Sequence, residues 1–347
     1  MKKIFLPESE RELQELNRRL LEDAWEPSHR QPSRILWHYT TADGLKGILE
    51  SCRQDVWEVR KAPDGNIGFN VIPGSCNLRA TNVFYMNDSR EVAYAQDLMI
   101  EEISRVRGKY PGPADEFLEH AAIGVGITGM VFQPHVACFC DEQAGDLLSQ
   151  WRGYTNMGGG YALGFRSDSL ASHSPSIQLR KVIYDVTLQR KLVEDTINEF
   201  CTLLCTLAPS VGSSATKLQS MIDDFGYMVG QVLREFVYCF KHPGFTEEQE
   251  WRLVQRVVPY KTADKSLVTI EGASFRVSSG LLVPYIELNI GEQDGNDGLW
   301  RLPLEQINIG PTLRQDLAES SLQQILNKHD YDMTHAVKIA CSDIPLV

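Results

Sequence analysis

The stretch Ile35-Leu36-Trp37-His38-Tyr39-Thr40, with the helix-forming residues that follow it, decides the fold of this chain. Apolar, aromatic and β-branched side chains in a run of six residues indicate a buried strand. Thr41 or Asp43 is placed to cap a helix over residues 44–51, whose leucines and isoleucine offer an apolar face. We therefore expect a strand that leads directly into a helix packed against it.

His38 lies near the end of this strand, and two interpretations of it remain open. The ring can point into a cleft, or it can fill a core position with a single hydrogen bond. Because successive side chains of a strand alternate between its faces, His38 shares a face with Thr40. Polar groups held at the end of a packed strand-helix unit are well placed to bind a ligand.

Hydrophobic periodicity and turn residues predict the remaining elements. Strands are expected within residues 78–86, 136–140, 161–165, 250–257, 275–277, 281–289, 307–309 and 337–341. Helices are expected from Pro7 to about Trp25, from Asn87 to about Glu102, over 146–154 and over 313–328. Glu91 is placed to close a capping box on Asp88. Residues 63–76 have the composition of a hairpin or loop, and residues 188–239 have helical spacing interrupted only near 209–214.

The composition limits the classes of function. The chain has 347 residues, of which 43% are hydrophobic, and this is ample for a packed core. A formal net charge of -12 argues against a generic phosphate-binding surface, although it leaves room for a local basic pocket. No run reaches the roughly 18 to 20 apolar residues that cross a bilayer. The amino terminus lacks the pattern of a signal peptide, so we expect a cytoplasmic protein with no membrane partner.

Eight cysteines are spread along the chain. Neither Cys138-x-Cys140 nor Cys201-xxx-Cys205 has the paired spacing of a zinc site, and the density is below that of a disulfide scaffold. We therefore expect reduced, mostly buried thiols and no metal site.

The stretch Glu248-Gln249-Glu250-Trp251-Arg252 carries the sharpest candidate for chemistry. On a strand, Glu248 and Glu250 would point to the same face, where like charges repel unless a partner, a raised pKa or a ligand relieves them. The alternative is a solvated loop acid at Glu248 and an ion pair from Glu250 to Arg252 or Lys241. The aromatic and basic loop over residues 240–245 is either a lid over a ligand or a plain turn.

Other polar and aromatic residues allow both a structural and a functional interpretation. Tyr85 is either a core residue or a platform on which a flat heterocycle stacks. Arg152 is equally suited to a structural ion pair with Glu91 or Glu250 and to binding a phosphate. The glycines at 158–160 form neither a Walker loop nor a dinucleotide-binding GxGxxG, so a turn is expected there.

Several short segments form a pattern that spans most of the chain from about residue 35 onward. They are Trp37-His38-Tyr39-Thr40, Met86-Asn87-Asp88-xx-Glu91, Leu148-Ser149-Gln150-Trp151-Arg152, Gly159-Gly160-Tyr161-Ala162-Leu163-Gly164-Phe165, Lys241 with Glu248-x-Glu250-Trp251-Arg252, Ile309-Gly310-Pro311 and Cys341-Ser342. Together these segments resemble the bacterial domain-of-unknown-function family twenty-nine seventy-one.

The order of an early-strand histidine, a later aromatic and an acid near a strand start also resembles the ADP-ribosyltransferases of the His-Tyr-Glu type. This resemblance implies that His38 binds the ribose of the adenosine half of NAD. It further implies that Thr40 lies beside that ribose and that the backbone of Tyr39 meets the nicotinamide amide.

The same resemblance assigns the reacting half of the dinucleotide. Tyr85 would stack on nicotinamide, although Tyr154 or Tyr161 can take that place. Glu250 would hydrogen-bond the nicotinamide ribose, and Glu248 would orient the acceptor. Cleavage of the nicotinamide bond develops positive charge on a ribose carbon, which a fixed carboxylate stabilises.

These observations predict one α+β domain built on a split, mostly antiparallel sheet with flanking helices. Residues 1–33 are expected to form an amino-terminal helix and linker, and residues 34–347 a catalytic domain with a helical insertion at about 188–239. The expected function is NAD-dependent transfer of ADP-ribose to a macromolecular acceptor, either protein or nucleic acid, as in toxins or defence systems. Alternatives are an NAD glycohydrolase and a non-catalytic module that binds a nucleotide or a protein.

Overall fold

The protein is described by a computed structural model over residues 15–16, 19, 32–61, 67–86, 89–110, 112–126, 133–155, 159–172, 177–257, 260–261, 268–269, 272–278, 280–331 and 336–345. Most of the expected amino-terminal helix and linker lies outside the described residues, as does Asp88 of the expected capping box. Within that terminal segment, Leu16 is helical and buried against the helical part of the molecule.

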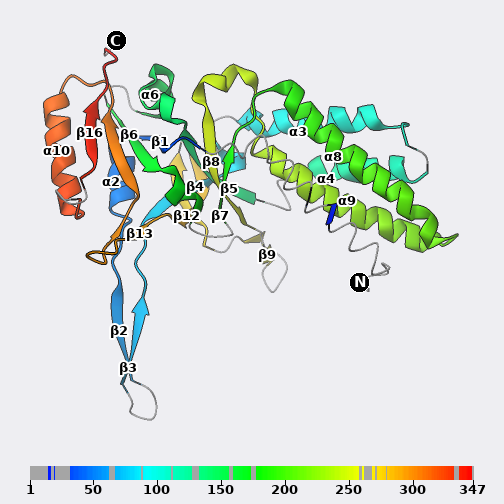
Figure 1. The fold of residues 1–347 in the computed structure, drawn as a ribbon, viewed down its shortest axis with the longest axis horizontal. Coiled ribbons are helices and arrows are strands. Elements are labelled where there is room, and N and C mark those ends of the chain that lie inside the picture. The colour runs from blue at the N-terminus through cyan, green and yellow to red at the C-terminus, as the bar shows by residue number, and fades with distance from the viewer. Residues whose placement is uncertain are drawn as a thin grey trace.

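Strands and helices are interspersed along the chain, with runs of consecutive strands early and late in the sequence (Figure 1). The principal strands are β1 (Ile35–Thr40), β2 (Val56–Lys61), β3 (Ile67–Ile72), β4 (Asn77–Asn82), β5 (Gln133–Cys140), β6 (Tyr161–Arg166), β7 (Ile177–Lys181), β8 (Glu250–Val257), β11 (Ser274–Ser278), β12 (Leu281–Asn289), β15 (Leu304–Ile309) and β16 (Lys338–Cys341). Two-residue strands are β9 (Tyr260–Lys261), β10 (Val268–Thr269), β13 (Glu292–Gln293) and β14 (Trp300–Arg301). The helices are α2 (Ala42–Leu49), α3 (Ser89–Val106), α4 (Ala114–Gly126), α6 (Leu148–Tyr154), α7 (Ser167–Ser172), α8 (Val186–Leu207), α9 (Ala215–Val237) and α10 (Gln315–Lys328). Short 3-10 turns are η1 (Val83–Tyr85), η2 (Glu142–Ala144), η3 (Ala208–Val211) and η4 (Pro243–Glu248).

The main sheet has the order β11-β12-β4-β5-β1-β6-β15-β16, with β8 and β7 joined to it through β5. Its pairings are antiparallel except for the parallel pair of β15 and β16. The expected α+β fold with a mostly antiparallel sheet is therefore confirmed.

The sheet branches at β5. Strand β8 pairs with β5 along its whole length, from Gln133 to Cys140. The other edge of β5 is divided, because β4 pairs only near Val136 and β1 only at Cys140. Strands β1 and β4 thus diverge between these points and leave an opening beside the middle of β5.

A lobe of four helices, α3, α4, α8 and α9, lies at one end of the sheet (Figure 1). Phe117, Phe200 and Phe225 stack edge to face or in parallel at its centre, with ring centroids 6.1 to 6.3 Å apart. Helices α8 and α9 match the helical spacing predicted over 188–239. Helix α4 was not predicted, because its alanines and glycines show weak amphipathic periodicity.

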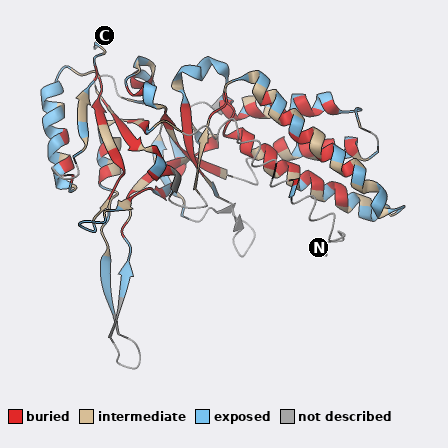
Figure 2. Ribbon diagram, in the orientation of Figure 1, coloured by how far each residue is buried: buried red, intermediate tan, exposed pale blue. Residues whose placement is uncertain are grey.

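Two further groups of buried side chains cover the faces of the sheet (Figure 2). Leu36 and Phe165 pack with helices α2 and α10 on one face. Trp37, Tyr39 and Trp151 pack beneath α6 on the other. The β2–β3 hairpin projects away from the body, and its apolar side chains are largely exposed.

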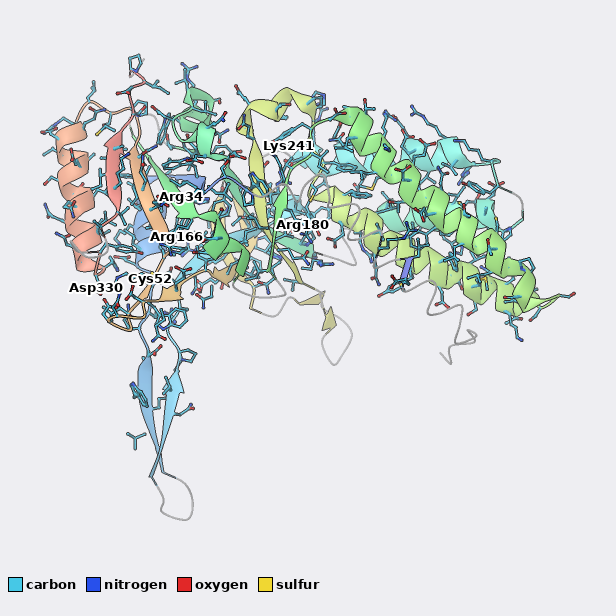
Figure 3. The ribbon with its side chains drawn as sticks, viewed as in Figure 1. Arg34, Cys52, Arg166, Arg180, Lys241 and Asp330 are labelled. Atoms are coloured by element: carbon cyan, nitrogen blue, oxygen red, sulfur yellow. A yellow bond between two sulfur atoms is a disulfide. The ribbon has the colours of Figure 1, made fainter. Side chains whose placement is uncertain are left out.

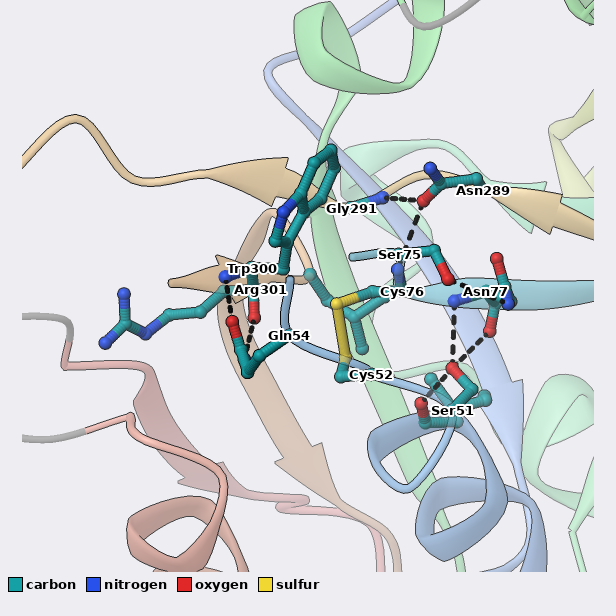
Figure 4. Close-up of a disulfide and its surroundings, with 12 residues drawn as sticks. Ser51, Cys52, Gln54, Ser75, Cys76, Asn77, Asn289, Gly291, Trp300 and Arg301 are labelled. Atoms are coloured by element: carbon teal, nitrogen blue, oxygen red, sulfur yellow. Dashed lines mark hydrogen bonds between the residues drawn. A yellow bond between two sulfur atoms is a disulfide. The ribbon is translucent and has the colours of Figure 1, made fainter. Parts of the chain in front are cut away.

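A disulfide joins Cys52, just after α2, to Cys76, just before β4 (Figure 4). The expectation that all eight cysteines are reduced was therefore wrong, because the turn after α2 and the return of the hairpin bring these two side chains together. Beside it, the Ser51 hydroxyl donates to the carbonyl of Asn77 at 2.9 Å and accepts from its backbone N–H at 2.8 Å. Of the six free cysteines, Cys140, Cys201 and Cys239 are buried, as expected of structural thiols.

None of the helices in the described part of the chain combines the length and the apolar composition that crossing a bilayer requires.

Candidate functional site

A cavity of about 870 Å³ opens where β1 and β4 diverge from β5. This volume lies within the range of roughly 300 to 1,000 Å³ that is usual for small-molecule sites. Seven of the eight residues predicted for the site line this one cavity: His38, Tyr39, Thr40, Tyr85, Tyr154, Glu248 and Glu250. The eighth, Arg152, is exposed on α6 and does not line it.

His38 is held at the opening in the sheet. Its Nδ1 lies 2.8 Å from the carbonyl oxygen of Cys138, in the part of β5 that pairs with neither β1 nor β4. Because a carbonyl only accepts hydrogen bonds, Nδ1 carries the proton of the neutral ring and Nε2 is left as an acceptor. Burial lowers the pKa of His38, and the charge of Arg276 lowers it further against the opposing Cys138 bond. The imidazole is therefore neutral near pH 7.

Tyr39 and Thr40 follow the predicted alternation along β1. The Tyr39 side chain points away from His38 into the core, where its hydroxyl donates to Ala144 at 2.6 Å and accepts from Leu147 at 3.1 Å. Only the backbone of Tyr39 is thus available to a ligand, as the sequence resemblance implied. Gly44 lies so close to the Thr40 hydroxyl that a Cβ there would be 1.9 Å from it, so helix α2 needs glycine at this position.

Glu248 and Glu250 meet, although only Glu250 lies on a strand. Glu248 ends η4, and Gln249 between them has a left-handed backbone with φ of 43°. The Lys241 ammonium bridges the two acids, with Nζ at 2.6 Å from Glu248 Oε2 and 2.8 Å from Glu250 Oε2. The expectation of a Glu-x-Glu on one strand was therefore wrong in its local structure, and a cation relieves the repulsion between the acids.

Arg252 completes this buried cluster from the same face of β8. Its Nε lies 2.8 Å from Glu250 Oε1, and its Nη2 pairs with Glu91 and lies 2.9 Å from Glu250 Oε2. The Lys241 ammonium also lies 3.8 Å from Glu91. The Lys241 label in Figure 3 marks the cluster at the junction of the sheet and the helical lobe. Three carboxylates face two cations, so one negative charge is left unbalanced when all are ionised.

The electrostatic environments of the two central acids differ. Burial alone would raise the pKa of Glu250, but Arg252 and Lys241 outweigh it and lower this pKa to about 2. Burial raises the pKa of Glu248 despite the opposing charge of Lys241. Glu250 is therefore a fixed anion, whereas Glu248 is the better proton acceptor of the pair.

The structure also decides between the earlier alternatives for these charges. The alternative of an ion pair from Glu250 to Arg252 or Lys241 is confirmed, and both cations are partners. The description of Glu248 as a solvated loop acid was wrong, since only 14% of its side chain is exposed. The alternative in which Arg152 pairs with Glu91 or Glu250 was also wrong, because Arg252 pairs with both acids.

Three aromatic side chains stand at the rim of the cavity. Tyr85 is 47% exposed and Tyr154 is 41% exposed, so both rings have a face open to a ligand. Phe245 lies over the Lys241 ammonium, 5.2 Å from it, and brings the loop after α9 against the site. Tyr161, the other predicted stacking residue, packs against the core that includes α2 and α10 and does not line the cavity.

Sequence reasoning missed several residues of the site. The Tyr184 hydroxyl accepts a hydrogen bond of 3.1 Å from the Glu250 backbone N–H, and burial raises the pKa of this hydroxyl. No local pattern distinguishes Tyr184 from an ordinary loop aromatic. Arg79 and Arg276 line the opposite end of the cavity. Apolar and polar residues alternate in the stretch Leu78-Arg79-Ala80-Thr81, and this alternation could have predicted a polar face on β4.

The comparisons with known proteins match one family model to part of the chain and give no activity. The model of a family described as "Protein of unknown function (DUF2971)" matches residues 150–253, a range that contains Tyr154, Lys241, Glu248 and Glu250 but not β1. No curated protein and no solved structure matches the chain at a significant level. The family resemblance drawn from the sequence is thus supported over that range.

Proposed function

We propose that this protein is a cytoplasmic, ADP-ribosyltransferase-like enzyme that cleaves NAD and transfers ADP-ribose to a macromolecular acceptor. The observation that carries the proposal is the gathering of His38, Tyr154 and Glu250, which are remote in sequence, around one cavity of dinucleotide size. NAD is a substrate in this reaction, and no metal ion is required for it.

The charge of the buried cluster suits the bond that is broken. When the bond between the ribose carbon and the nicotinamide nitrogen breaks, the electron pair leaves with nicotinamide and positive charge develops on the ribose. An unbalanced negative charge that is fixed before the reaction stabilises that transition state without reorganisation. The cluster carries this charge when Glu248 and Glu91 are also ionised, and Glu250 contributes to it because its pKa, about 2, keeps it ionised.

The remaining groups suit the two ends of the substrate. The Nε2 atom of His38 can accept a hydrogen bond from a ribose hydroxyl, and the exposed faces of Tyr85 and Tyr154 can hold the flat nicotinamide ring. Glu248 is placed to accept the proton that an acceptor hydroxyl, amide or amine loses as its new bond to the ribose carbon forms. Its raised pKa favours that role.

The proposal is tested by incubating the full chain with NAD and a cell extract and following the products by mass spectrometry. Release of nicotinamide with a labelled macromolecule supports transfer, and free ADP-ribose without any label identifies an NAD glycohydrolase instead. Unchanged NAD at high enzyme concentration contradicts both catalytic functions and favours a binding module.

Two buried carboxylates provide a matched pair of variants for this assay. Glu250→Gln is expected to abolish nicotinamide release. Glu235→Gln removes an equally buried acid that pairs with Arg256 at 2.8 Å outside the cavity, and it is expected to retain release. Both reactions are run well below the unfolding temperatures of the variants. Full activity of Glu250→Gln would rule out the proposed role of this carboxylate.

A further inference from the structure

The end of the cavity opposite the acidic cluster is formed by one face of strands β4, β12 and β11. Arg79 lies opposite Glu287, and Arg276 lies opposite Val283. Because Val283 and Glu287 are four residues apart on β12, both arginines leave the sheet on the same face. That face lines the cavity, whereas the intervening Ala80 of β4 is buried in the core on the other face.

Both guanidinium groups are held in place by neutral partners. The Arg276 side chain reaches across β12 and donates a hydrogen bond of 2.9 Å to the Thr81 hydroxyl on β4. The Arg79 guanidinium lies 4.9 Å from the ring centre of Tyr285, in a cation-π contact. These contacts fix the positions of the two groups and leave their charges uncompensated.

The acidic side chains that line the same end of the cavity do not form ion pairs with these two arginines. Glu287, directly across from Arg79, accepts a hydrogen bond of 3.2 Å from Asn77. Glu50 pairs with Lys46 at 2.5 Å, and Asp43 lies in the first turn of α2. Among the described residues, no carboxylate lies within ion-pair distance of Arg79 or Arg276.

The two cations also oppose each other. Burial lowers the pKa of Arg276, and the charge of Arg79 lowers it further. Two neighbouring arginines that are partly desolvated and unpaired are electrostatically costly, and an anionic ligand relieves that cost. Planar guanidinium groups match the oxygens of a phosphate particularly well.

We propose that Arg79 and Arg276 bind the phosphate groups of a dinucleotide or nucleoside diphosphate that enters the cavity. This inference deepens the proposed function, on which it rests for the identity of the full substrate. The two arginines line the same cavity as His38, and Arg276 is near enough to affect the pKa of His38. A pyrophosphate here would place one nucleoside against His38 and extend toward Glu250.

The test measures binding rather than catalysis, so that it can fail independently of the proposed function. The full chain is titrated calorimetrically with ADP and with adenosine, which differ only in the diphosphate. ADP is expected to bind more tightly, and Arg276→Gln is expected to weaken ADP binding roughly 10- to 100-fold, as for a lost charge-assisted hydrogen bond. Adenosine binding is expected to be unchanged.

Further variants separate a lost contact from a damaged fold. Arg79→Gln is expected to act as Arg276→Gln does, and Arg276→Lys is expected to recover part of the affinity because it keeps the charge. Arg107→Gln serves as the matched control, since this arginine pairs with Glu119 in the helical lobe at 3.8 Å.

The inference is overturned if wild-type protein binds ADP no better than adenosine, or if Arg79→Gln and Arg276→Gln bind ADP as the control does. Arginine-dependent ADP binding in a protein that never releases nicotinamide supports the phosphate site while contradicting the proposed reaction. Nicotinamide release by a protein whose ADP binding is independent of both arginines supports the proposed reaction and contradicts the phosphate site.

Discussion

Glu248 and Glu250 are two residues apart and share Lys241, yet neutralising them should have different effects on stability. The pKa of Glu250 is lowered from 4.5 to about 2 in the folded protein. Its ionisation therefore stabilises the fold above pH 4.5, by about 3 kcal/mol, and that stability is lost as the pH falls toward 2. The pKa of Glu248 is raised, so the folded state disfavours its ionised form at neutral pH.

The substitutions Glu250→Gln and Glu248→Gln test this difference. Glu250→Gln leaves the fully buried Arg252 with one carboxylate fewer, and removal of one partner of a buried ion pair typically costs about 3 to 5 kcal/mol. We expect a loss of about 3 kcal/mol for Glu250→Gln at pH 7. Glu248→Gln should cost almost nothing or stabilise the protein slightly.

Guanidinium denaturation followed by tryptophan fluorescence measures both changes, and Trp251 next to the cluster is a buried reporter. Repeating the measurement at about pH 3 should leave roughly half of the difference between wild type and Glu250→Gln, because the wild-type carboxylate is then almost fully protonated in the unfolded state but still mostly ionised in the folded state. Equal losses for the two variants at pH 7, or a loss for Glu250→Gln that does not change with pH, would refute the reasoning.

Three further predictions concern the disulfide, the sheet and the histidine. Replacing Cys52 and Cys76 with serine should lower the free energy of unfolding by about 3 kcal/mol, as loop entropy gives for a separation of 24 residues, and chemical denaturation under non-reducing conditions measures this. Gly164→Ala should cost about 1 to 3 kcal/mol and lower the thermal midpoint, because its Cβ would lie 2.9 Å from the Trp37 ring; an unchanged midpoint would show that β6 can shift. NAD binding measured calorimetrically should stay constant down to about pH 6.5 and weaken below it, because the lowered pKa of His38 keeps Nε2 free to accept a hydrogen bond. His38→Asn should remove this pH dependence. NAD binding that already weakens above pH 7 would contradict the assignment.

The elements with strong local signals were predicted well. The strands at Glu250–Val257 and Leu281–Asn289 have their predicted bounds, and the cap that begins α2 is Thr41, whose hydroxyl accepts from Gly44. In these segments the alternation of side chains and the capping chemistry agree with the tertiary environment. Strand β7 was not predicted, because all five of its residues are only half-buried and show no alternation.

The sequence predicted which residues belong to the site better than it predicted the contacts between them. The residue types near His38 and Glu250 marked two parts of one cavity, but their partners come from remote segments. Arg252, and not Arg152, pairs with Glu91 because strand β8 meets helix α3 in the folded chain, a contact that the local sequence pattern does not contain. The basic end around Arg276 was missed for the same reason, since its guanidinium acts across a neighbouring strand.

The central claim is that one cavity holds a whole dinucleotide between the arginines and the carboxylates. A crystal structure of Glu248→Gln, which should keep the fold intact, soaked with NAD tests it most directly. We predict that the pyrophosphate lies at Arg79 and Arg276, with the nicotinamide ribose at Glu250 and a ribose hydroxyl at His38. A dinucleotide bound elsewhere, or a cavity that stays empty at saturating NAD, would contradict the account.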